Sequence, residues 1–171
     1  KAAEKKESYT TTAKTYPADY RAYNNLATIA LAEGNLEQAK NYLKQAASKN
    51  DCAEVNANFA LVALAEGNVK DAETYVSRAT SAPNYNELVG NLNVAKGNFA
   101  AAAQNLKGAK TNSTALAEIL TKNYTEAEKT LANVKKADAM TDYLKAVLAA
   151  RTGKANEAVK QLKNAIQKEP S

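Results

Sequence analysis

Histidine and tryptophan are absent from this chain of 171 residues, and cysteine occurs once, at Cys52. Histidine is the usual general base and the commonest metal ligand in proteins, so the chain lacks the ordinary means of acid–base catalysis. One cysteine excludes an internal disulfide and cannot build a thiolate metal site. No glycine-rich phosphate loop occurs either. We therefore expect a protein that is not an enzyme, with no catalytic residue, no cofactor-binding residue and no metal ligand.

Long apolar runs are also missing, and none approaches the ~20 residues that a membrane-spanning helix needs. The chain begins with Lys1 rather than methionine, and nothing in it resembles a signal peptide. We expect a processed product or an excised piece of a longer protein. A removed leader, a lipid anchor or a further domain therefore stays open.

The formal net charge is +5, which has two interpretations. One is a solvated surface rich in lysine, and the other is a patch that binds nucleic acid or acidic lipid. The lysines alternate with acidic residues, and basic runs are as short as Lys5-Lys6 and Lys135-Lys136. This pattern favours the solvated surface and predicts no nucleic-acid partner.

A short pattern recurs along the chain at intervals of roughly 30 residues, which is typical of stacked helical repeats. Gly34-Asn35 is followed by a bulky residue and then by Ala39, and related segments occur four more times. The equivalent turn positions are Gly34, Gly67, Gly97, Lys122 and Gly153. Self-similarity of this kind predicts units that bury their apolar faces only against their neighbours.

Each unit is predicted to be a pair of antiparallel helices. In the first complete unit, Gly34 ends one helix because the chain must turn through positive φ. Asn35 then caps the next helix, with Gln38 three residues further on. Asp51 and Glu54 are spaced to start the following helix. Cys52, near that start, is either a reactive thiol or a small filler.

Small residues recur at three positions where helix axes should cross, which permits close packing. They are Ala27, Ala60, Gly90, Ala115 and Ala146 on first helices, and Ala39, Ala72, Ala102, Ala127 and Ala158, then Ala46, Ala79, Ala109, Val134 and Ala165, on second helices. The expected large packing partners are Leu43, Val76, Leu106, Leu131 and Leu162.

The positions Tyr23, Leu26, Ala27, Gly34, Leu36, Ala39, Leu43 and Ala46, with Pro83 and Pro170 near unit ends, resemble the tetratricopeptide repeat (TPR) family. This resemblance implies an all-α fold, a right-handed α-α superhelix of about five helix pairs with an N-terminal capping helix. We expect a single domain, residues 1–171. Its parts are an N-terminal helix, 1–16, ended by Pro17, and repeats at 18–50, 51–82, 83–110, 111–136 and 137–170.

The pattern weakens in the fourth and fifth units. Lys122 replaces the turn glycine, and the helix near Ser113–Thr121 is short. Lys145 stands where an apolar residue is expected. The last helix, Asn156–Lys168, carries one narrow apolar stripe, so it can end the array against water. The array can thus be complete as a monomer, although the oligomeric state stays open.

In the family that this chain resembles, first helices line a concave groove that binds proteins. The residues expected to face or border it are Asn24, Thr28, Leu31, Asn58, Leu61, Leu64, Asn91, Val94, Leu116, Tyr143 and Val147. Asparagines offer both a donor and an acceptor to a peptide backbone, or they only bridge adjacent repeats. Positions that match the family's carboxylate clamp carry no cation, which argues against that clamp.

The amino-acid sequences of segment 16–26 (YPADYRAYNNL) and of segment 143–147 are similar to those of repeat regions in Gram-negative envelope proteins. Those proteins also carry an outer-membrane-protein-A-like, peptidoglycan-binding module. The resemblance implies a periplasmic setting, with a cytoplasmic one as the alternative. We expect a scaffold that binds a protein or peptide segment. The alternatives are a purely structural spacer between envelope modules and an electrostatic binder of nucleic acid or acidic glycans.

Overall fold

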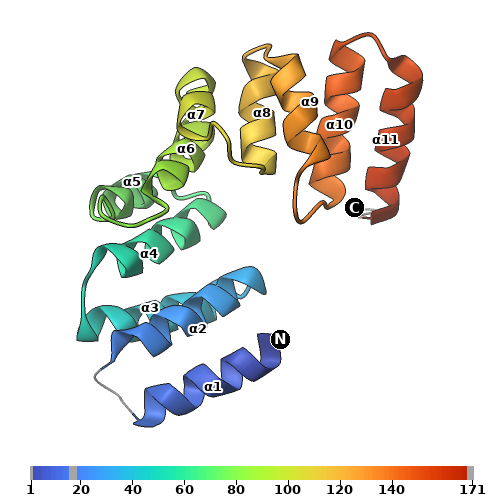
Figure 1. Ribbon diagram of the computed structural model, residues 1–171. Coiled ribbons are helices and arrows are strands. Elements are labelled where there is room, and N and C mark those ends of the chain that lie inside the picture. Colours follow the sequence, from blue (N-terminus) through green and yellow to red (C-terminus); the bar gives the residue numbers. More distant parts are fainter. Residues whose placement is uncertain (1, 16–18, 169–171) are drawn as a thin grey trace. The chain divides into compact units, whose positions relative to one another are not determined.

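The computed structural model describes residues 2–15 and 19–168, and within these ranges it contains helices and no strand (Figure 1). The helices are α1 (Ala2–Thr15), α2 (Tyr20–Ala32), α3 (Leu36–Lys49), α4 (Ala53–Ala65), α5 (Val69–Ser77), α6 (Tyr85–Lys96), α7 (Phe99–Asn105), α8 (Asn112–Leu120), α9 (Tyr124–Ala132), α10 (Ala139–Arg151) and α11 (Ala155–Lys168). The predicted all-α fold of helix pairs is confirmed. No helix among the described residues is long and apolar enough to cross a bilayer.

The chain forms two compact units, and the boundary lies between Ala95 and Lys96. In unit 1, α1 packs beside α2, α2 pairs with α3, and α4 pairs with α5. In unit 2, α7 packs beside α8, and α8–α9 and α10–α11 form pairs within 111–136 and 137–170. The boundary falls inside the range 83–110, and the single domain of five repeats stays a prediction.

The predicted N-terminal helix agrees with α1 over the described residues, since α1 spans Ala2–Thr15. Lys1, Tyr16 and Pro17 lie outside the described residues, and so does Pro170. The predicted helix ends at these positions are therefore left as predictions.

The turn between the helices of a pair has the geometry that its glycine predicts. Gly34 has a φ of 76°, and the N–H of Asn35 returns to the carbonyl of Ala30 at 2.9 Å. The side-chain oxygen of Asn35 accepts a hydrogen bond from the N–H of Gln38 at 3.2 Å, and its amide donates to the Gln38 side chain. This satisfies an otherwise orphaned helix N–H, and the predicted cap is confirmed.

The predicted start of α4 is wrong in its capping residue. The N-cap is Cys52, which makes no side-chain capping hydrogen bond. Asp51 instead accepts a hydrogen bond from the Asn56 side chain at 2.9 Å, and Glu54 accepts one from the Tyr20 hydroxyl at 3.3 Å. Both carboxylates are thus used by other side chains. Cys52 is half-buried and packs against the core of α2 and α3, as the small-filler interpretation expects.

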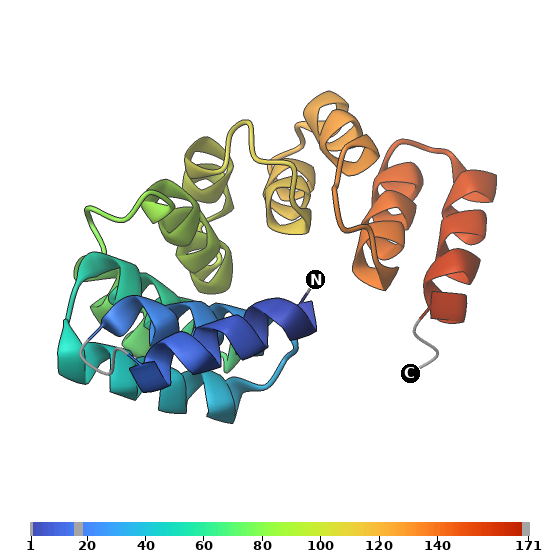
Figure 2. The ribbon, with the colours of Figure 1, turned by 60° about the horizontal axis from the view of Figure 1, so that its bottom comes forward.

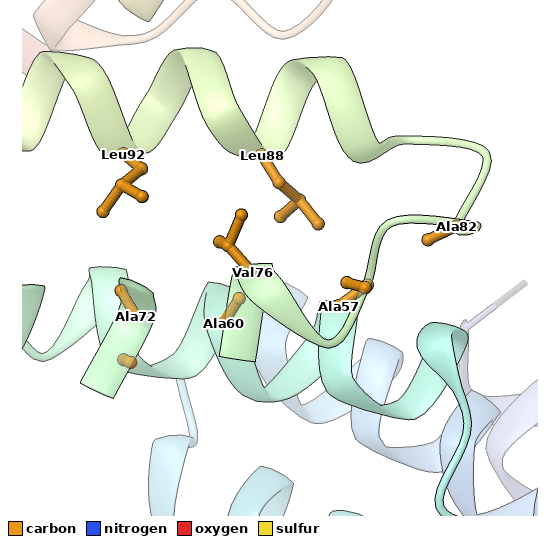
Figure 3. Packing of buried hydrophobic residues seen from close by; sticks show 9 residues of the cluster. Ala57, Ala60, Ala72, Val76, Ala82, Leu88 and Leu92 are labelled. Carbon is orange, nitrogen blue, oxygen red and sulfur yellow. The ribbon is translucent and has the colours of Figure 1, made fainter. Parts of the chain in front are cut away.

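The small residues lie at buried crossings, as the repeat register predicts. Ala27, Ala60, Gly90, Ala115 and Ala146 are buried, and so are Ala39, Ala72, Ala102, Ala127 and Ala158. In Figure 3, Ala57, Ala60 and Ala72 lie beneath the larger side chains Val76, Leu88 and Leu92. The third position is less uniform, since Ala46 and Ala79 are buried while Ala109, Val134 and Ala165 are half-buried.

The apolar stripe of α11 is only partly covered, which corrects the expected role of Leu162. Leu162 is 44% exposed, and Val159 and Ile166 are 52% and 59% exposed. Ala158 is the one residue of the stripe, among those described, that is buried. The helix that packs against α11 among the described residues is α10.

Candidate protein-binding surface

The residues predicted for a groove lie on the first helices of their pairs, distributed over both units. Unit 1 holds Asn24, Thr28 and Leu31 on α2, Asn58, Leu61 and Leu64 on α4, and Asn91 and Val94 on α6. Unit 2 holds Leu116 on α8, and Tyr143 and Val147 on α10. The two sets are therefore two surfaces, each described within its own unit.

Hydrogen bonds bring three of the predicted residues together in unit 1. The Asn58 amide donates to the side-chain oxygen of Asn24 at 2.8 Å and to the Thr28 hydroxyl at 3.3 Å. The Thr28 hydroxyl donates in turn to the backbone carbonyl of Asn24 at 3.1 Å. Asn58 thus joins α4 to α2 and bridges adjacent repeats, as one of the two sequence interpretations expects.

The bridge also leaves polar atoms free for a ligand. Asn24 and Asn58 are half-buried, and Thr28 is exposed. The bridge uses the Asn24 oxygen and the Asn58 amide, so the Asn24 amide remains as a donor and the Asn58 oxygen as an acceptor. A peptide unit needs one acceptor for its N–H and one donor for its carbonyl. The pair offers both groups with their side chains already held in place.

The apolar members are shared between the core and the surface. Leu31 packs against the cluster around Ala27, and Leu61 and Leu64 pack against the cluster around Ala60. All three leucines are half-buried, as are Asn91 and Val94 on α6. The exposed portions can contact a ligand, while the buried portions hold the helices together.

In unit 2, the predicted residues differ in how far they are exposed. Leu116 and Val147 are half-buried and pack against the cluster that includes Ala115 and Leu148. Tyr143 is 45% exposed and stands out from α10. An exposed tyrosine combines apolar area with a hydroxyl, a combination that is common where proteins bind other proteins.

Sequence reasoning missed a polar link between α8 and α10. The Asn112 amide donates to Asp138 at 3.1 Å, and the Asn112 oxygen accepts from the Thr141 hydroxyl at 2.9 Å. Asp138 and Thr141 also form a capping box at the start of α10. Burial acts to raise the pKa of Asp138, but hydrogen bonds from Thr141 and Asn112 outweigh it and hold the pKa below its ordinary value.

A corresponding contact lies between the starts of α2 and α4. Burial first, and then the neighbouring Cys52 and Glu54, raise the pKa of the Tyr20 phenol above its ordinary value. Tyr20 donates to Glu54 through its hydroxyl, so it acts as a link between helices. Within residues 2–15 and 19–168, no group of three acidic, cysteine or histidine side chains is placed to hold a metal ion.

Comparison with known proteins supports the fold class. Residues 30–89 match the family model described as tetratricopeptide repeat. No curated protein matches the sequence at a significant level. A TPR protein from Parabacteroides merdae ATCC 43184 superposes with a TM-score of 0.67 at 14% identity, over 98% of this chain and 72% of that one.

Two further solved structures are similar over nearly the whole chain. PilW, a widely conserved type IV pilus biogenesis factor, has a TM-score of 0.67 and 20% identity, over 96% of this chain and 84% of its own. YrrB, a TPR protein with an unusual peptide-binding site, has a TM-score of 0.56 and 18% identity, over 97% and 94%. The chain therefore has the fold of a TPR protein.

Proposed function

We propose that this chain is a non-catalytic scaffold that binds an extended segment of a partner protein along its first helices. The observation that carries the proposal is the Asn24–Asn58 pair, whose mutual hydrogen bond leaves the Asn24 amide as a donor and the Asn58 oxygen as an acceptor for a ligand. The proposed surface of unit 1 comprises Asn24, Thr28, Leu31, Asn58, Leu61, Asn91 and Val94. Leu116, Tyr143 and Val147 form the corresponding surface of unit 2.

Binding on the surface of unit 1 combines backbone hydrogen bonds with apolar contact. The Asn24 amide donates to a carbonyl of the bound segment, and the Asn58 oxygen accepts from one of its N–H groups. The exposed portions of Leu31 and Leu61 contact the side chains that flank this peptide unit. Because the bridge already holds both asparagines, little side-chain entropy is lost when the segment binds.

The proposal includes a cell-envelope setting, in which the chain is one part of a larger periplasmic protein with an adjoining peptidoglycan-binding module. This setting is supported by the sequence similarity of segments 16–26 and 143–147 to Gram-negative envelope proteins. It is also supported by the structural similarity to PilW, which is described as a pilus biogenesis factor. Fractionation of cells that express the full natural protein tests the setting. Recovery of the protein in the cytoplasmic fraction would count against it.

A peptide selected on the protein itself tests the binding function. Random peptides displayed on phage are selected on the 171-residue chain, and the best binder is titrated against Asn58→Leu. We expect the affinity of Asn58→Leu for the peptide to be about tenfold lower, because the variant loses one hydrogen bond to the peptide and the hydrogen bond that positions Asn24.

The matched control is Asn41→Leu, which makes the same substitution on an exposed position of α3. It should leave the affinity unchanged. Equal affinities for Asn58→Leu and the unaltered chain would refute binding at this surface, provided that both proteins retain their helical circular dichroism.

A further inference from the structure

A hollow in unit 2 lies between the second helices of two neighbouring repeats. It is bounded by the second helices α9 and α11, and α10 forms its floor; the three helices lie side by side in Figures 1 and 2. Its volume is about 370 Å³, and its lining includes Leu131, Lys145, Leu148, Ala149 and Gln161.

Unit 1 contains the equivalent hollow, between α3 and α5 over α4, with a volume of about 370 Å³. The small-residue register aligns the two linings position by position. Lys145 precedes Ala146 as Phe59 precedes Ala60, and Gln161 follows Ala158 by the interval that separates Tyr75 from Ala72. The protein therefore holds two versions of one surface.

In unit 1, two aromatic side chains line the hollow beside its floor residue Val62. The rings of Phe59 and Tyr75 are stacked, with centroids 4.9 Å apart and planes inclined by 14°. Lys40 and Glu66 form an ion pair of 2.5 Å at the edge. The floor residue Val62 is only 2% exposed.

In unit 2, both features are missing at the equivalent positions. Lys145 and Gln161 replace the two rings, and Glu128 and Thr152 replace the ion pair. The Thr152 hydroxyl donates back to the carbonyl of Leu148 at 2.9 Å. Among the residues that the structure describes, no ion pair involves Lys145.

The apolar floor is correspondingly less covered. Leu148 is 8% exposed where its equivalent Val62 is 2% exposed, and Leu131 is 3% exposed where its equivalent Leu43 is 0% exposed. The two hollows thus have equal volumes and equivalent floor positions, but unit 2 lacks the stacked pair of rings, and the aromatic residue of its lining is Tyr124 on α9. Aromatic rings are what this chain itself places beside the equivalent floor residue in unit 1.

We propose that the hollow between α9 and α11 is a binding site for an aromatic side chain presented by a partner protein. The ring lies on Leu148 and Ala149, in the space between Lys145 and Gln161. The Lys145 ammonium, which no described carboxylate engages, faces the ring and makes a cation–π contact. Glu128 and Lys154 at the edge are available to the backbone on either side of the ring. This site shares no residue with the Asn24–Asn58 surface, so either can exist without the other.

Nuclear magnetic resonance on the full 15N-labelled chain tests the site, with acetyl-Ala-Tyr-Ala-amide as the probe and acetyl-Ala-Ala-Ala-amide as its control. We expect the tyrosine peptide to shift the amide signals of residues 145–161 in a saturable manner, in the millimolar range. The alanine peptide should not do so. The equivalent segment of unit 1, residues 59–75, is an internal control, and its signals should stay in place because Phe59 and Tyr75 already stack on each other.

A variant that copies unit 1 provides the decisive comparison. Lys145→Phe with Gln161→Tyr supplies the missing stack, and we expect probe binding to weaken by about tenfold or more. If this double variant fails to fold, Gln161→Tyr alone serves for the same comparison, since it adds one ring on the side of α11. The proposal is overturned if the tyrosine peptide shifts no signal of residues 145–161, or if the alanine peptide shifts them equally. It is also overturned if a folded variant that carries Gln161→Tyr binds the tyrosine peptide with unchanged affinity.

Discussion

Replacing Lys122 by glycine should stabilise the protein, although it removes a side chain. Lys122 has a φ of 65° at the turn between α8 and α9, where the equivalent residues Gly34, Gly67 and Gly153 have values of 76°, 75° and 80°. The hydrogen bonds are also equivalent, since Lys122 N–H reaches the Ile119 carbonyl at 3.0 Å as Gly34 N–H reaches that of Leu31 at 3.0 Å. The lysine therefore adopts a conformation that only glycine adopts without strain.

The magnitude follows from two opposing effects. A side chain in the left-handed conformation costs about 1–2 kcal/mol. Glycine gives the unfolded chain extra freedom, which returns about 0.4–1 kcal/mol. We therefore expect Lys122→Gly to raise the free energy of unfolding by about 0.5–1 kcal/mol. Urea titration followed by circular dichroism measures the change.

The opposite substitution, Gly67→Ala, isolates the backbone effect. A Cβ atom at Gly67 would have no heavy atom within 4 Å, so the substitution causes no clash and adds only strain. It should lower the free energy of unfolding by about the same 0.5–1 kcal/mol. Lys122→Ala is the control, because it removes the long side chain and keeps the strain. If Lys122→Gly destabilises the chain, or if Lys122→Ala stabilises it equally, the reasoning is refuted.

Two further predictions concern packing and pH. Ala72 is completely buried, so Ala72→Leu should overpack the helix crossing and lower the free energy of unfolding by about 1–3 kcal/mol, measured by thermal melts. The control Lys70→Leu, on the exposed side of α5, should have little effect. Equal melting temperatures for the two variants would show that the repeat register is wrong. Because the folded-state pKa of Asp138 is lowered, its contribution is present above its unfolded pKa of about 4 and is lost as the pH falls through the lower folded value. Asp138→Asn should therefore lose less stability than the unaltered chain between pH 5 and pH 2, and parallel losses would contradict this.

Much of the local structure could be predicted from sequence because each signal acts within a few residues. Gly34 and Asn35 end one helix and begin the next through bonds that reach at most five positions along the chain. The alanines at the crossings could be predicted by periodicity, and Ala39 and Ala72 are completely buried. The cap of α4 could not be predicted, because Asp51 turns to Asn56 rather than to the helix start.

The candidate surfaces depended on contacts between helices, and periodicity predicted them only in part. The register placed Asn24, Thr28 and Asn58 on first helices, but the hydrogen bonds among them set which polar atoms remain available. The departure of Lys145 from the repeat pattern was evident in the sequence. What this departure means for the hollow of unit 2 required comparison with unit 1, where Phe59 and Tyr75 stack at the equivalent positions.

The amino-acid sequence by itself determined the helices, their turns and the small residues at their crossings, because backbone conformation and helical periodicity act over a few neighbouring residues. Only the tertiary structure settled how side chains about 30 positions apart share their hydrogen bonds, and which hollow the chain lines with a stacked pair of rings. These contacts depend on the side-chain orientations of two or three helices together. No single segment of the sequence specifies that arrangement.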